Sequence, residues 1–267
     1  METLKKKVEE YIKHIPMLAN VVVELATLDR SGENYFERVE EIIGADPSYA
    51  LRVVGAANAA TFASQEPIKS IGVAVSRLGA SRAASLALGF GVMDVFVIRE
   101  EWERRMWRHS VSMAFACKEI ANASKDPKVT PDLAYLAGLL HDVGMLVLLR
   151  VGPERLHQLI DDHGCDSAEA LRLELEVFGL SHPELGGMIC RQWNCPKVLE
   201  VAVESHHLPR KIPLQSTGDK LTGLVSLMER AITICEQEGV GLDMAEAEDF
   251  DLRELVQKQL PPFIQMP

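Results

Sequence analysis

The sequence predicts an all-α protein. Helix-forming residues, chiefly Leu, Ala, Glu, Val and Arg, are plentiful in this chain of 267 residues, and aromatic residues make up only 6% of it. No segment shows the strict alternation of apolar and polar residues, bounded by turns, that is typical of strands. Helix start and stop signals instead divide the chain into a series of helical segments.

The N-terminal part of the chain contains short helices whose ends are marked by turn residues. Asp46 and Pro47 give a strong start signal, with Asp as the N-cap and Pro at the first helical position. The small-residue run at 55–60 favours close packing against a neighbouring helix. In order, these helices are expected at His14–Leu28, at Tyr35–Ile43, from Pro47 onward, at Ser70–Leu78 and at Ser81–Phe96.

The last two of these helices superficially resemble a DNA-binding helix-turn-helix motif, because a Gly-containing turn joins them. Arg77 and Arg82 are the only basic residues nearby that could contact DNA phosphates. The second helix is too apolar to lie in the major groove of DNA. DNA binding through this pair is therefore the least favoured of the functions considered.

The C-terminal part contains longer helices, and two of them begin with capping boxes. Asp166 with Glu169, and Ser181 with Glu184, have the required spacing. The helices are expected at Glu100–Ser124, Pro131–Arg150, Leu156–Ile160, Asp166–Phe178, Pro183–Trp193, Pro196–His207, Gly218–Gln237 and Leu252–Leu260.

Charge and composition indicate a soluble, cytoplasmic protein. The net charge of −11 argues against non-specific nucleic-acid binding, which depends on Lys and Arg. The basic start at Lys5–Lys7 is followed by acidic residues and not by the apolar core of a signal peptide. The longest apolar run, Leu133–Leu149, is interrupted and slightly short for a membrane span. Five cysteines without a C-x-x-C pair predict neither a disulfide framework nor a zinc site.

The Pro131–Arg150 helix contains an anomaly at its centre. It is apolar on all sides, which predicts burial, yet His141 and Asp142 lie side by side within it. A buried carboxylate costs several kcal/mol unless it is paired or binds a metal. Some other part of the chain must therefore meet this pair.

Histidines on several other predicted helices are candidates to meet it. Imidazole with carboxylate is the ligand combination for Zn, Mn or Fe at a hydrolytic centre. Any one of these histidines could instead be an ordinary core residue, and a pair at a helix C-terminus could serve only the helix dipole. Their recurrence favours a metal site, whose candidate ligands are His109, His141, Asp142, His182, His206, His207 and Glu229.

Several sequence blocks resemble a known family. The stretch AYLAGLLHDVGMLVLL is similar to the signature of the HD superfamily of metal-dependent phosphohydrolases. The blocks IIGADPSYALRVVGAANAATF, IKSIGVAVSRLG, WRHSVSMAFACKEIA, HPELGGMICRQWNCP and AVESHH resemble the HDOD branch in the same order, over about Ile15–Val240. The resemblance implies an N-terminal helical lobe at 1–98, an HD-like helical lobe at 99–240 and a C-terminal helical tail at 241–267. It also implies a bacterial signalling module, here expected to stand without a fused partner domain.

The resemblance also assigns roles to individual residues. His109 matches the first histidine of the HD pattern, and His141 with Asp142 matches its doublet. His182, His206 and His207 match the histidines that the related HD-GYP cyclic-di-GMP phosphodiesterases use for a second metal. Glu229 lies where an Asp ligand is expected. One or two Fe, Mn or Zn ions are therefore implied.

The departures from active relatives concern the residues that contact substrate. Met145 replaces the Lys that follows the doublet in active relatives, and the loop after His207 lacks a GYP sequence. We therefore expect a non-catalytic HDOD module that binds a signalling protein and retains a metal site. The alternative is a metal-dependent phosphohydrolase acting on a cyclic dinucleotide, with Asp142 as the candidate catalytic residue.

Overall fold

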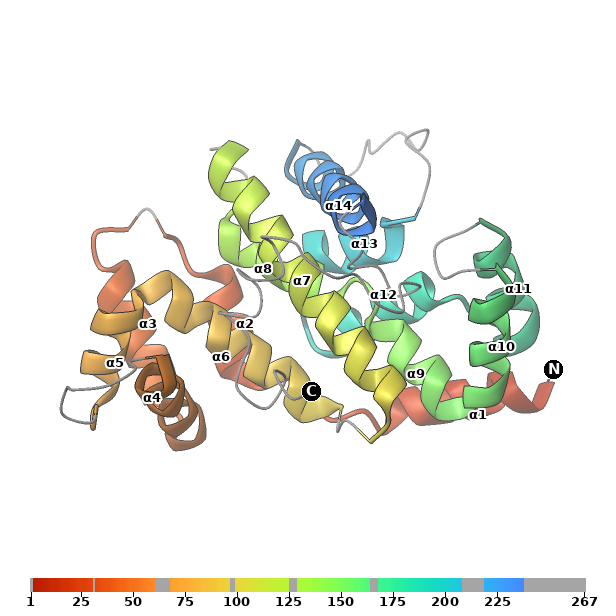
Figure 1. Ribbon diagram of the computed structural model, residues 1–267, viewed down its shortest axis with the longest axis horizontal. Helices are drawn as coiled ribbons and strands as arrows, with labels where there is room; N and C mark the ends of the chain where they lie inside the picture. Colours follow the sequence, from red (N-terminus) through yellow and green to blue (C-terminus); the bar gives the residue numbers. More distant parts are fainter. Residues whose placement is uncertain are drawn as a thin grey trace. The chain divides into compact units, whose positions relative to one another are not determined.

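The structure, a computed structural model, describes residues 2–30, 32–60, 68–96, 99–124, 129–163, 168–207 and 219–237. All regular secondary structure in these ranges is helical, which confirms the predicted all-α class. The chain divides into two compact units (Figure 1), one with the described residues of 18–97 and a larger one with those of 1–17 and 98–252. The helix expected at Leu252–Leu260, the tail that contains it and the loop at 208–218 lie outside the described ranges.

The smaller unit is built around α6, which contacts the unit's other four helices. Most residues of α6 are small or apolar and are buried, so α6 is the core helix of this unit. A DNA-recognition helix needs an exposed polar face, which this position does not offer. The helices of the unit are α2 (Asn20–Thr27), α3 (Tyr35–Gly44), α4 (Pro47–Ala60), α5 (Ile71–Leu78) and α6 (Ala80–Val95).

The larger unit is organised around the long helix α7, which packs along α8 and α14. α12 packs against both α9 and α13, while α1 lies against α9 and α11. Figure 1 shows α7 running across this unit beside α8 and α9. The helices are α1 (Glu2–Lys13), α7 (Glu101–Ser124), α8 (Pro131–Leu140), α9 (Val143–Val151), α10 (Pro153–His163), α11 (Ala168–Phe178), α12 (His182–Gln192), α13 (Lys197–Ser205) and α14 (Asp219–Gln237).

The segment predicted as one helix at Pro131–Arg150 is divided in two. α8 ends at Leu140, His141 is its C-cap, and Asp142 is the N-cap of α9 with φ −101° and ψ 15°. The predicted burial on all sides is observed, because every residue from Leu133 to Leu149 is buried. Pro131–Val151 has the length and apolar composition of a membrane-crossing helix, and its most apolar window is wholly buried within the fold.

Two glycines on either side of this break allow neighbouring helices to come close. A Cβ added to Gly138 would lie 2.6 Å from the carbonyl oxygen of Met113 on α7. A Cβ added to Gly144 would lie 2.0 Å from the carbonyl oxygen of His182 on α12. Because both contacts are to backbone atoms, a side chain at either position would push a helix away from the His141–Asp142 turn.

Gly144→Ala should therefore destabilise the protein. Overpacking a well-packed core typically costs about 1–3 kcal/mol, and the clash here is with backbone that cannot rotate away. We expect the free energy of unfolding, measured by urea denaturation, to fall by at least about 2 kcal/mol. Gly55→Ala on α4 is the matched control: a Cβ there meets nothing within 4 Å, so the helix propensity of Ala should raise stability slightly. Equal effects of the two substitutions would contradict this account.

Candidate metal centre

Helix ends and one helix face bring a cluster of histidines and a carboxylate together inside the larger unit. His109 comes from α7, while His141 and Asp142 form the turn between α8 and α9. His182 is the first residue of α12, and His206 and His207 follow the last residue of α13. Ligand atoms in two groups lie within 4.8 Å of one another: His109, His141 and Asp142 form the first group, and Asp142, His182, His206 and His207 form the second.

The positions at the helix ends follow from local sequence. The predicted capping box is present at the start of α12: the Ser181 backbone N–H donates to Glu184 Oε2 at 2.8 Å, which places His182 in the first turn. At the other end of the cluster His206 is the C-cap of α13, and its Nδ1 lies 2.6 Å from the Val203 carbonyl oxygen.

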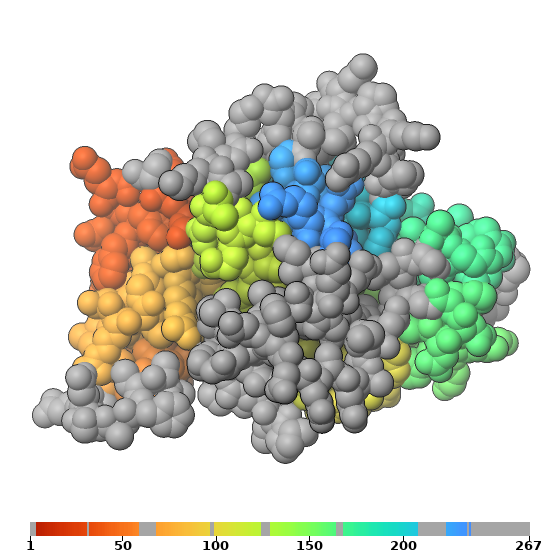
Figure 2. Space-filling model, turned by 45° about the horizontal axis from the view of Figure 1, so that its top comes forward, coloured from red at the N-terminus to blue at the C-terminus, as the bar shows by residue number. Residues whose placement is uncertain are grey.

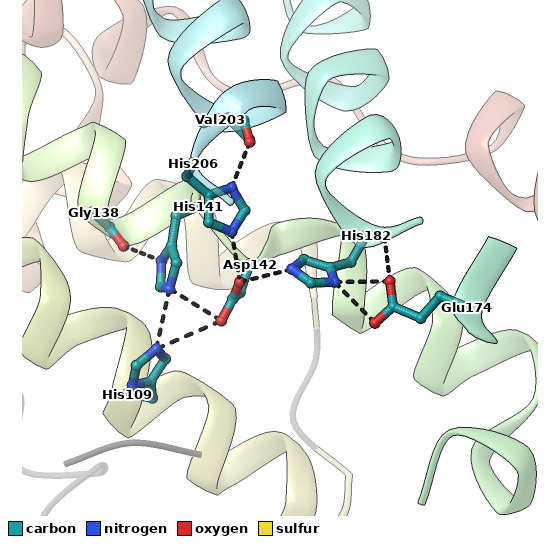
Figure 3. Close-up of polar contacts among 8 residues, drawn as sticks. All are labelled: His109, Gly138, His141, Asp142, Glu174, His182, Val203 and His206. Atoms are coloured by element: carbon teal, nitrogen blue, oxygen red, sulfur yellow. Dashed lines mark hydrogen bonds and ion pairs between the residues drawn. The ribbon is translucent and has the colours of Figure 1, made fainter. Parts of the chain in front are cut away.

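Each oxygen of the Asp142 carboxylate faces a different set of rings (Figure 3). Oδ2 lies 3.0 Å from His141 Nε2 and 3.5 Å from His109 Nε2. Oδ1 lies 3.4 Å from His206 Nε2 and 3.5 Å from His182 Nε2. Asp142 therefore belongs to both groups and lies between them.

The proton positions on three rings can be assigned from their other contacts. The Nδ1 atoms of His141 and His206 face the backbone carbonyl oxygens of Gly138, at 2.8 Å, and Val203, at 2.6 Å. The Nδ1 of His182 faces both carboxylate oxygens of Glu174, at 2.8 and 2.9 Å. Because these acceptors carry no hydrogen, each Nδ1 must be the protonated nitrogen, and in the neutral ring Nε2 then offers a lone pair.

Burial and mutual charge determine the ionisation of the cluster. Burial alone would raise the pKa of Asp142, but the surrounding imidazole rings, His141 foremost, outweigh it and hold the pKa well below its usual range. Burial, together with the charge of His207, lowers the pKa of His206 to about 3 despite the nearby Asp142. An ionised carboxylate oxygen and a neutral His206 nitrogen, both acceptors, thus lie 3.4 Å apart.

Glu174 is a buried residue beside the cluster that the sequence reasoning missed. It lies on α11, is fully buried, and its only described polar contacts are with His182. A signal was present, because Ala170, Glu174 and Phe178 recur at four-residue spacing and all three are buried. A charged residue on the apolar stripe of a helix needs a partner, as Asp142 does.

Glu229 and Met145, which the sequence also singled out, lie on α14 and α9. Glu229 lies on α14, is half-buried, and belongs to neither group of ligand atoms found among the described residues. Its role as a ligand stays a prediction. Met145 lies on α9, is fully buried, and its backbone N–H donates to the Asp142 carbonyl oxygen at 2.9 Å.

Comparison with known proteins points to one family. The model of the HDOD domain matches residues 15–209. An uncharacterised protein of Treponema pallidum (strain Nichols) is 22% identical over 204 residues, which cover 76% of this chain, and the chain spans only 40% of that relative's length.

Solved structures show the same fold. An HDOD domain protein of unknown function from Geobacter sulfurreducens matches with a TM-score of 0.68 and 24% identity, over 96% of this chain and 85% of the other. A Marinobacter aquaeolei protein, provisionally named a signal transduction protein, matches with a TM-score of 0.65 and 18% identity, over 99% and 61%. A Shewanella amazonensis protein, provisionally named a phosphohydrolase, matches with a TM-score of 0.59 and 20% identity, over 96% and 93%.

The low pKa of His206 predicts that the metal-free protein loses stability in weak acid. Below about pH 6.5 the unfolded chain binds a proton on this ring that the folded chain rejects until about pH 3. The stability is therefore complete above pH 6.5 and is lost as the pH falls, by about 1.4 kcal/mol from this ring at about pH 5.5. Urea unfolding with a chelator should show this loss, and His206→Gln should reduce it by that amount.

His163→Gln, at an exposed position on α10, is the control and should leave the pH dependence unchanged. A pH dependence that is identical in the wild type and in His206→Gln would contradict the assignment of a neutral, buried His206.

Proposed function

This chain belongs to the HDOD domain family, and from that premise we propose that it is a non-catalytic signalling module with a buried divalent metal centre. Its helical surface would bind a protein partner. The observation that carries the proposal is the combination of a nearly complete set of metal ligands with a buried, neutral Met145 beside them.

The ligand set fits a divalent cation. Asp142 Oδ1 and the neutral His206 Nε2 both offer lone pairs across 3.4 Å, and a buried pair of acceptors is stable only with a cation or a proton between them. The low pKa of His206 argues against the proton. Imidazole nitrogens combined with a carboxylate favour Fe, Mn or Zn over Mg or Ca.

Two ions would share Asp142. One would be held by His109, His141 and Asp142, and the other by Asp142, His182, His206 and His207. The two divalent ions would neutralise the buried carboxylate and together cross-link α7, the α8–α9 turn, α12 and the end of α13. Metal binding would in this way contribute directly to the folding free energy of the larger unit.

Two features favour a scaffold over an enzyme. His109, His141, Asp142, His182 and His206 are each at most 6% exposed, so solvent has little access to these five ligands. Met145 has an uncharged thioether. By the resemblance, active relatives have a lysine at this position, and its ammonium group is suited to contact phosphate. Hydrolysis needs both an open coordination position and stabilisation of phosphoryl charge.

The partner is expected to be a signalling protein with a basic surface. The net charge of −11 gives this chain an acidic surface overall, which would steer basic partners toward it. A cyclic dinucleotide remains the alternative ligand, associated with the rival function of a metal-dependent phosphodiesterase. That rival is favoured by the ligand set itself, because the same residues would activate a bound water for attack on phosphorus.

Removal of the metal should destabilise the protein. An ion whose free concentration is about 1,000 times its dissociation constant stabilises the folded state by about 4 kcal/mol. This corresponds to a Tm change of about 10 °C for a chain of this size. We expect elemental analysis to find Fe, Mn or Zn in the purified protein, and calorimetry to show this fall in Tm after chelation and its recovery on adding the ion. A metal-free protein whose Tm is insensitive to added ions would overturn the metal proposal.

The metal-loaded protein should not hydrolyse phosphodiesters. We expect no release of product from bis(p-nitrophenyl) phosphate or cyclic di-GMP with Mn or Fe present, in parallel with an active HD-GYP phosphodiesterase as the positive control. Asp142→Ala should lower metal content without any change in turnover. Turnover by the wild type that Asp142→Ala abolishes would instead establish the phosphohydrolase alternative.

A further inference from the structure

The Glu174 carboxylate makes its described polar contacts with His182. Its Oε2 accepts hydrogen bonds from the His182 backbone N–H, at 2.7 Å, and from the ring Nδ1–H, at 2.8 Å. Its Oε1 lies 2.9 Å from the same Nδ1. Within the described part of the chain no other residue makes a polar contact with this carboxylate.

The burial of the Glu174 carboxylate costs free energy unless a positive charge nearby compensates for it. The side chain is 0% exposed, and the residues one turn before and after it on the buried face are Ala170 and Phe178. Burying a carboxylate costs several kcal/mol, which hydrogen bonds to a neutral partner offset only in part. A cation bound to the far side of the His182 ring would supply the missing compensation.

The turn between α11 and α12 is shaped to make this contact. Gly179 has φ +81°, the left-handed conformation that lets the chain reverse directly after α11. The Ser181–Glu184 capping box then starts α12, and the backbone N–H of His182, in the first turn of this helix, donates to Glu174. Ring and backbone contact the same carboxylate, so the backbone hydrogen bond holds Glu174 in place and rotation of the ring would break its Nδ1 contacts.

His182 differs in this respect from the other rings of the cluster. The Nδ1 atoms of His141 and His206 face backbone carbonyl oxygens, which are neutral acceptors. Only His182, among the rings with an assigned Nδ1 contact, has an anionic acceptor. A carboxylate behind a histidine fixes its tautomer and raises the basicity of the opposite nitrogen.

We propose that Glu174 is a positioning residue that makes the two metal positions unequal. It holds the proton on His182 Nδ1 and directs Nε2 at Asp142 Oδ1, 3.5 Å away. The ion held by Asp142, His182, His206 and His207 is therefore bound more tightly than the ion held by His109, His141 and Asp142. This inference rests on the metal centre of the proposed function.

Selective loss of one ion is the first test. Glu174→Gln removes the negative charge with little change in shape, and Glu176→Gln at an exposed position on the same helix is the matched control. Calorimetric titration of the metal-depleted full chain with Mn²⁺ or Zn²⁺ should resolve two binding events in the wild type and in the control. In Glu174→Gln the tighter event should weaken about 10- to 100-fold and the other should stay unchanged. Equal weakening of both events, or of neither, would overturn the proposal.

The tautomer of His182 is the second test, and it needs no metal. ¹⁵N NMR of the metal-free protein, with the His182 signals assigned by their loss in His182→Ala, should show the proton on Nδ1. In Glu174→Gln the Nε2–H form should become populated, because the amide offers a hydrogen-bond donor to Nδ1. A wild-type ring protonated on Nε2 alone would overturn the positioning role, even if Glu174→Gln fails to fold. Wild-type protein that binds no ion but shows the Nδ1 proton would refute the metal centre while leaving the tautomer assignment intact.

Discussion

The negative charge of Asp142, buried at the α8–α9 turn, is the constraint around which the centre of the larger unit is arranged. An uncompensated carboxylate in this position would cost several kcal/mol, a large part of the stability of an ordinary domain. Its two oxygens face separate sets of imidazole rings, contributed by α7, α12 and the end of α13. The surroundings of one carboxylate therefore bring together segments that are up to about 100 residues apart in the chain.

The backbone supports this arrangement as much as the side chains do. A continuous helix through residues 131–151 would separate neighbouring side chains by about 100°. The break between α8 and α9 instead allows His141 and Asp142 to contribute to the same cluster. Gly138 and Gly144 permit α7 and α12 to approach on the two sides of the break. Glu174 is a second buried carboxylate in this region. It contacts Nδ1 of His182, the ring whose Nε2 faces Asp142.

A structural metal site and a catalytic metal site have the same requirements for their ligands but differ in what else they need. Both need imidazole and carboxylate ligands held in place by outer contacts. Only the enzyme needs a position open to substrate and a charge that stabilises the phosphoryl group. In the described part of this chain His109, His141, Asp142, His182 and His206 are almost fully covered, His207 is half-buried, and Met145 supplies no charge.

The sequence by itself determined the helical class, the family and the residue types of the cluster, because periodicity, capping signals and motif spacing are local properties. It singled out six residues whose ligand atoms the structure brings within 4.8 Å of one another in two groups: His109, His141, Asp142, His182, His206 and His207. Tertiary structure decided the rest: the break at His141–Asp142, the division of the Asp142 oxygens between two groups, and the pairing of Glu174 with His182. These depend on how closely helices pack and on where a turn directs the next helix, which are distances in space that no spacing along the chain encodes.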